Sequence, residues 1–156
     1  MRKDNWPCVL PRAQEYEHRR EYGRAAQAYE WAAQAAPWYA EMLTLWARFQ
    51  ATCPEAALRD GAEAVASATR ARKLTQRDSH DILDALAAAC AEAGQFEQAV
   101  KWQAQSAPRL HAEARPGLYA HDQAKLALYR AGQPYRGQYL LAGKLIAHYS
   151  FDDISG

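Results

Sequence analysis

Long apolar runs are missing from this chain of 156 residues. No stretch approaches the 18 uninterrupted apolar residues of a membrane-spanning helix, so we predict no span. The start, Met1–Pro7, is basic but leads into no apolar segment, and we therefore expect no secretory signal peptide. An excess of one charge is also missing, because 19 Lys and Arg against 18 Asp and Glu leave a net charge of +1. Such a balance argues against nucleic-acid binding or attraction to an anionic membrane.

Cysteine is scarce, and its three occurrences, Cys8, Cys53 and Cys90, lie far apart. An odd and widely spaced set fits neither a disulfide framework nor a Cys-x-x-Cys zinc site. We expect buried or half-buried free thiols, since unpaired cysteine behaves as a small apolar residue. Free thiols favour a reducing compartment, and a cytoplasmic location is the expectation.

Helix signals are dense, whereas a strand pattern occurs only near the end, at Lys144–Phe151. The most informative stretch, Asp81–Val100, reads as an amphipathic helix, a stop at Gly94 and a second helix. We predict an all-α fold, with Asp78 or Ser79 capping the helix that ends at Gly94. The predicted helices are Pro11–Tyr22 (stopped by Gly23), Arg24–Ala36, Trp38–Thr52, Gly61–Leu74, a fifth ending at Gly94, Gln95–Ala107 (stopped by Pro108), Leu118–Ala131 and Pro134–Ile146.

Small residues recur at a fixed spacing. Ala28, Ala64 and Ala99 are 36 and 35 residues apart, early in alternate helices, and a second small residue follows each by seven. Small side chains at such points let two helices approach closely. A period near 35 predicts stacked helical hairpins. The second set of small residues is Ala35, Ala71 and Ser106.

This pattern resembles the tetratricopeptide repeat (TPR) family over about Pro11 to Tyr135. The best copy carries the family's Leu, small residue, Gly-x-aromatic turn and Ala at Leu83, Leu86, Ala87, Gly94, Phe96 and Ala99, with Ser106 in place of the last Ala. A long turn at Ala51–Gly61 departs from the pattern. Together with Leu83–Ala89 and Leu128–Tyr135, it looks like a TPR subtype of large bacterial multidomain proteins. The resemblance implies a right-handed superhelical solenoid of three to four antiparallel hairpins. We expect an N-terminal extension at 1–10, the repeat domain at 11–146 and a tail at 147–156.

The resemblance further implies a concave groove lined by the first helix of each hairpin. Its positions are mixed in charge but lean acidic around the third hairpin, which would suit a basic peptide. Tyr119 and Leu126 would add apolar contact, although all these positions could equally be plain solvated faces. The family's Lys, Asn and Arg clamp for a terminal carboxylate is replaced here. The predicted groove residues are Glu17, Arg20, Glu21, Glu41, Thr44, Arg48, Asp81, Asp84, Ala88, Glu92, Tyr119, Asp122, Leu126 and Arg130.

Catalytic and metal signals are weak. His80 and Asp84 lie one helical turn apart and could share a metal, but two ligands do not make a site, and we interpret the histidines as surface residues. No phosphate loop, nucleophile elbow or metalloprotease motif occurs. The run Arg70–Lys73 ends a helix, where cations are favoured in any case. We expect Trp31, Trp38, Trp46 and Trp102 to be core residues.

The sequence therefore predicts a protein–protein interaction scaffold, with no enzymatic activity and no cofactor, metal, nucleic acid or membrane partner. Its partner would be a peptide or helix of another protein, held in the groove. The alternative is a structural spacer, or a self-association module of a larger multidomain protein that forms homo-oligomers by end-to-end stacking, because each repeat needs a neighbour to cover its apolar end.

Overall fold

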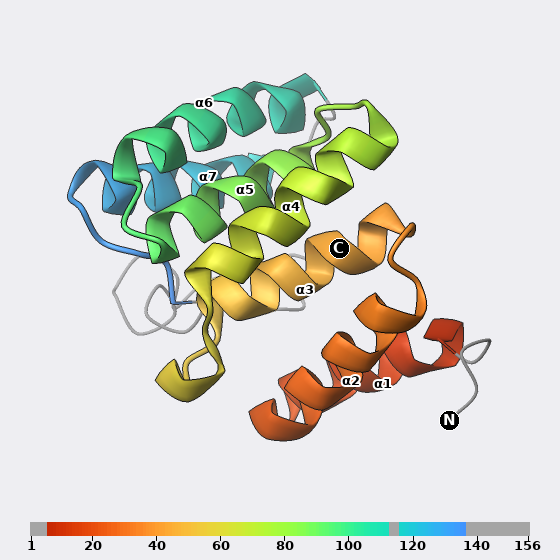
Figure 1. Cartoon of the computed structure of the whole chain (residues 1–156). Helices are drawn as coiled ribbons and strands as arrows, with labels where there is room; N and C mark the ends of the chain where they lie inside the picture. Colours follow the sequence, from red (N-terminus) through yellow and green to blue (C-terminus); the bar gives the residue numbers. More distant parts are fainter. Residues whose placement is uncertain (1–5, 113–115, 137–156) are drawn as a thin grey trace.

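The computed structural model describes residues 6–112 and 116–136, and this part of the chain is all-α with no strand (Figure 1). Local signals explain several boundaries. Asp60 caps α4 by accepting a hydrogen bond from Glu63 N–H at 3.0 Å, and Ser79, one of the two predicted caps, does the same for α5 from Ile82 N–H at 3.4 Å. The helices are α1 (Trp6–His18), α2 (Tyr22–Ala35), α3 (Ala40–Thr52), the 3₁₀ turn η2 (Ala56–Leu58), α4 (Gly61–Thr75), α5 (His80–Glu92), α6 (Phe96–Ala112) and α7 (Pro116–Arg130).

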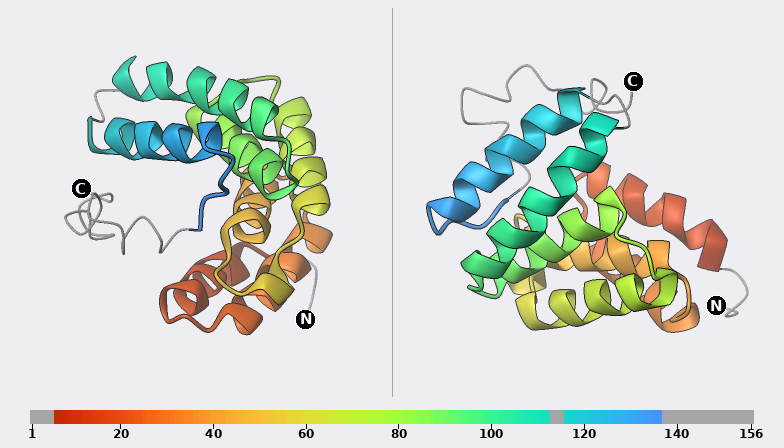
Figure 2. Two further views of the ribbon diagram at one scale, coloured as in Figure 1. Left: turned by 90° about the vertical axis from the view of Figure 1, so that its left-hand side faces the viewer. Right: turned by 90° about the horizontal axis from the view of Figure 1, so that it is seen from above.

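The helices pack in the order of the chain. Three antiparallel pairs, α1 with α2, α3 with α4 and α5 with α6, follow one another, and α7 packs against α6 (Figure 2). Helix α5 also lies against both α3 and α4, whereas the first pair meets the rest chiefly through α2 and α3. Each pair therefore contacts its neighbour in sequence, and the first pair makes no extensive contact with α5, α6 or α7 among the described residues.

Alanine fills the contact between the second and third pairs. Ala64 and Ala68 of α4 and Ala85 and Ala89 of α5 are fully buried in one apolar cluster. Side chains of this size permit short distances between helix axes. The small residues of the predicted repeat are buried too, except for Ala28, which is half-buried.

Two predicted helix stops are wrong. Gly23 lies inside α2, and the turn falls at Arg19–Glu21, where Arg20 takes the left-handed conformation with φ 63°. Pro108 lies inside α6, which continues to Ala112. A proline removes only one backbone donor, and α6, which packs against both α5 and α7, continues past it.

The ends of the repeat region also differ from expectation. Helix α1 begins at Trp6, within the predicted extension, and the Trp6 ring lies 4.6 Å from that of Tyr39. Residues 133–136 are not helical, and the rest of the predicted helix Pro134–Ile146, like the tail at 147–156, lies outside the described residues.

The expected burial holds for some of the cysteines and tryptophans and fails for others. Cys53 and Cys90 are buried free thiols as predicted, but Cys8 is exposed. Trp31, Trp46 and Trp102 are half-buried, whereas Trp38 is 64% exposed and is not a core residue. Among the described helices, none has the length and apolarity to cross a bilayer.

Candidate functional site

A pocket of about 240 Å³ opens between α3 and the start of α5. Glu41, Thr44 and Arg48 line it from α3, because residues three and four apart share one helix face. Asp81 lines it from the first turn of α5. All four were predicted groove residues, and the structure brings them together from two different hairpins. The remaining lining residues are Ala40, Leu45, Thr75, Ser79 and Ile82.

The mouth of this pocket is acidic. Asp81 is 74% exposed, and Glu41 is exposed and accepts a hydrogen bond from the Tyr39 hydroxyl at 2.6 Å. The single cation, Arg48, lies deeper and reaches both Asp81 at 3.9 Å and the buried Asp84 at 3.7 Å. An apolar wall and two accessible carboxylates suit a side chain with an aliphatic stem and a positive end.

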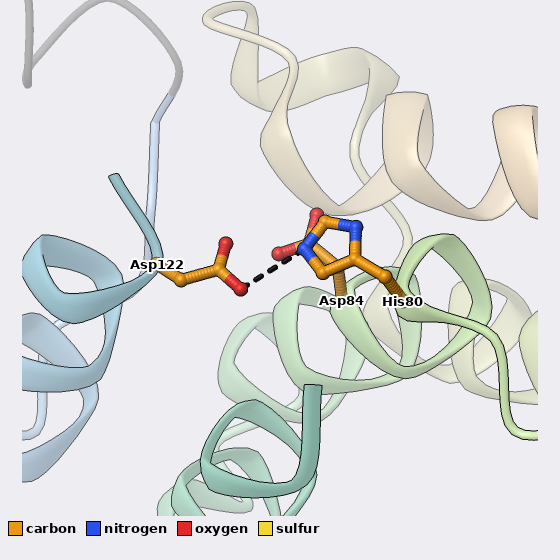
Figure 3. A group of neighbouring side chains, drawn as sticks. All are labelled: His80, Asp84 and Asp122. Atoms are coloured by element: carbon orange, nitrogen blue, oxygen red, sulfur yellow. Dashed lines mark hydrogen bonds and ion pairs between the residues drawn. The ribbon is translucent and has the colours of Figure 1, made fainter. Parts of the chain in front are cut away.

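Beneath this pocket lies a buried ionic cluster formed by His80 and Asp84 of α5 with Asp122 and Lys125 of α7. His80 Nε2 lies 2.9 Å from Asp122 Oδ2 (Figure 3). The Lys125 ammonium donates to Asp84 and lies 3.7 Å from Asp122 Oδ1. The Asp84, Asp122 and Lys125 side chains are each at most 7% exposed, and His80 is 11% exposed. The cluster therefore ties the third hairpin to α7.

Hydrogen bonds from α6 complete the cluster. Gln103 Nε2 donates to Asp84 at 3.3 Å and to Ser106 Oγ at 3.0 Å. The Ser106 hydroxyl lies 3.0 Å from Asp122 Oδ2. Ser106 and His80 thus share one acceptor, whereas in a nucleophile triad the histidine stands between the serine and the acid. With Ser106 also fully buried, this geometry does not match a hydrolytic site.

Charged neighbours within the cluster raise the pKa of His80 and lower the pKa of Asp84. Burial alone would lower the pKa of His80, but hydrogen bonds to Asp122 and Asp81 and the charge of Asp84 together raise this pKa to about 9. Burial would raise the pKa of Asp84, yet the positive charges of Lys125 and Arg48 hold it well below its usual range. At neutral pH a protonated His80 therefore lies beside an ionised Asp84.

His80, Asp84 and Asp122 bring one ligand atom each within 4.8 Å of one another, close enough to share a cation. The donor set of one imidazole and two carboxylates suits several divalent metals. However, the Lys125 ammonium already donates to Asp84 and approaches Asp122, so the positive charge that two buried carboxylates require comes from the chain itself. The residues fit an internally neutralised ionic cluster better than a metal centre.

The other predicted groove residues are dispersed. Glu17 accepts a hydrogen bond from the Tyr29 hydroxyl at 2.8 Å, and Glu21 pairs with Arg24 at 2.9 Å. Glu92 pairs with Arg59 at 3.1 Å and with Arg136. Ala88 and Leu126 are buried, while Arg20, Tyr119 and Arg130 are exposed.

The negative charge expected in the groove is thus largely neutralised by cations of the same chain. Asp84, Asp122 and Glu92 all meet cations within the chain. Asp81 meets Arg48 and His80 but stays exposed, as does Glu41. Interpreting His80 as a surface residue was wrong, since it faces Asp122 across 42 residues of sequence. Lys125 was missed, although a lysine three residues after Asp122 on one helix face was a usable signal.

Comparison with known proteins gives no relative, because no family model, no curated protein and no solved structure matches this chain. The resemblance to TPR proteins therefore stays a prediction from the residues quoted above.

Proposed function

We propose that this chain is a TPR-like helical-repeat module that holds a peptide segment of a partner protein on its concave face. Successive antiparallel pairs, buried alanines between them and the near-35-residue spacing support the solenoid interpretation. Rigid helices suit this role because a preformed surface loses little entropy on binding.

One observation carries the proposal: Glu41, Thr44, Arg48 and Asp81 come from two hairpins yet line a single pocket. A site assembled across a hairpin boundary depends on the stacked arrangement. The bound segment carries a Lys or Arg whose stem packs on Leu45 and Ile82 while its charge meets Asp81 and Glu41.

Binding explains the described residues better than catalysis does. The nearby imidazole is committed to Asp122, and the nearest hydroxyl of the ionic cluster, Ser106, is fully buried. We therefore propose a module without enzymatic activity. The spacer alternative predicts a chain that selects no peptide.

A random peptide-display selection against the whole chain tests the proposal. We expect enrichment of sequences that pair Lys or Arg with an apolar neighbour. The double variant Glu41→Gln/Asp81→Asn should bind the selected peptides roughly five- to tenfold more weakly, because two exposed charge contacts are lost. The matched control is Glu97→Gln, an exposed glutamate in the first turn of α6.

Two results would contradict the proposal. Selection without a consensus would favour a spacer, and equal binding by the double variant would place recognition elsewhere. Circular dichroism of each variant separates lost binding from lost folding.

A further inference from the structure

A second and larger pocket, about 490 Å³, lies between α2 and α4 on the opposite side of α3. Leu43, Trp46 and Gln50 of α3 face it, and at 100° per residue they stand across the helix from Glu41, Thr44 and Arg48. Figure 1 shows α3 passing between the two neighbouring helices. The two pockets therefore share a helix but no lining residue.

The long turn between α3 and α4, which departs from the family pattern, helps to shape this second pocket. Asp60 N–H donates to the Gln50 carbonyl at 3.1 Å and so holds the turn against α3. Asp60 then caps α4 and lines the pocket itself. The long turn thus forms part of the wall of the second pocket.

Gln50 provides the specific polar contact. The residue is only 5% exposed, lines the pocket, and its Oε1 accepts no hydrogen bond from any described residue. A buried acceptor without a donor is costly, and a turn of the Gln50 amide toward a ligand donor in the pocket removes that cost.

The walls and rim define the ligand further. Leu43, Trp46, Ala33 and Ala66 supply apolar and aromatic surface. Glu30 and Glu63 are exposed carboxylates at the rim, and Arg70 is the one cation among the lining residues. Glu63 reaches only the Ser67 hydroxyl, at 3.4 Å, and no described cation pairs with Glu30 or Glu63. The pocket is therefore net acidic.

We propose that the pocket between α2 and α4 binds an arginine side chain of a partner peptide. A guanidinium is flat, donates five N–H groups and stacks on aromatic rings. It meets the Gln50 acceptor and the Trp46 indole while its charge faces Glu30 and Glu63. This site is independent of the pocket between α3 and α5. It gives the module a second point of contact, on the other side of α3.

The test uses the whole chain and two probes of matched shape, N-acetyl-arginine amide and the neutral N-acetyl-citrulline amide, titrated by NMR. We expect the arginine probe to shift the Trp46 indole N–H and to bind at least roughly tenfold more tightly than the citrulline probe, since the charged donor is lost. Glu30→Gln/Glu63→Gln should weaken binding roughly fivefold. Gln50→Leu should weaken it roughly tenfold, and Glu97→Gln should not change it.

Several outcomes would overturn the inference. Equal binding of the two probes removes the charge requirement. If Glu41→Gln/Asp81→Asn weakens binding of the arginine probe and Glu30→Gln/Glu63→Gln does not, the probe binds in the pocket between α3 and α5 instead. Glu30 and Glu63 are exposed, so Glu30→Gln/Glu63→Gln should fold and still test ligand binding even if Gln50→Leu does not fold. A pentapeptide with central arginine that binds more weakly than the free amide would rule out a peptide ligand.

Discussion

At the scale of single residues, Lys125 and Asp84 show how this chain tolerates buried charge. Each side chain is at most 7% exposed, and each would be costly alone in a low-dielectric interior. Gln103 satisfies Asp84 further, while His80 and Ser106 approach Asp122. The cluster stabilises one relative position of α5 and α7 because its partners must all meet at once.

The pH dependence of folding should report on His80. Its pKa is raised to about 9 in the folded chain from an ordinary 6.5, so its contribution is fully present below pH 6.5 and is lost as the pH rises through 9. We expect the free energy of unfolding to fall by about 2–3 kcal/mol across that window. Urea denaturation at several pH values measures this.

His80→Gln is the control, and its stability should be nearly flat from pH 6.5 to 8. Nearer pH 9 it should fall slightly, because burial raises the pKa of the Cys53 and Cys90 thiols. His121 does not interfere, because burial and the charge of Lys125 lower its pKa to about 4, so its effect appears below pH 6.5. Parallel pH profiles for wild type and variant would show that His80 is not charged in the folded protein.

At the scale of elements, two glycines near helix starts differ in the space around them: Gly61 is crowded and Gly23 is not. Gly61 opens α4 against the end of α5, where an added Cβ would lie 2.7 Å from Ala93 N. Gly23 lies inside α2, where an added Cβ would meet nothing within 4 Å. One glycine permits close approach of two helices, and the other only lowers helix propensity.

Alanine substitution should therefore change stability in opposite directions. Gly61→Ala should destabilise the protein by about 1–3 kcal/mol, because backbone atoms must move. Gly23→Ala should stabilise it by about 0.5–1 kcal/mol, since alanine is the better helix former. Urea midpoints of both variants measure this, and a stabilising Gly61→Ala would show that α4 and α5 are not held this closely.

At the scale of the whole molecule, the first hairpin is joined to the rest through large side chains of one apolar cluster. Tyr29 of α2 packs on Phe49 of α3 with ring centroids 5.3 Å apart, and Phe49 stacks on Trp46 at 6.0 Å. The second and third hairpins instead share a broad alanine-rich interface. In stacked arrays, the loss of one interface releases one unit.

Phe49→Ala should therefore loosen the first hairpin selectively. We expect hydrogen exchange to accelerate in α1 and α2 while α5 and α6 remain protected, with a total cost of about 3–5 kcal/mol. Hydrogen exchange with mass spectrometry resolves these segments. Leu86→Ala, a buried α5 residue, serves as the comparison because it should loosen the third hairpin. Uniform acceleration throughout the chain would indicate a single cooperative unit.

Local patterns alone predicted the helices and the closely packed alanines, but they failed where packing overrides local preference. Pro108 lies inside α6 and does not end it, and Gly23 does not end α1 because the turn is made earlier, at Arg20. Trp38 was expected in the core because it falls at a hairpin junction, yet it lies in a turn and is exposed.

The sequence by itself determined an all-α chain and which residues of α3 share one face, because helical periodicity fixes such faces. Tertiary structure decided which charges remain accessible. Lys125 of α7 neutralises Asp84 of α5, and His80 of α5 meets Asp122 of α7, each pair about forty residues apart in sequence. Gln50 becomes a buried acceptor between α2 and α4. Such pairings depend on distances between helices, which no local pattern encodes.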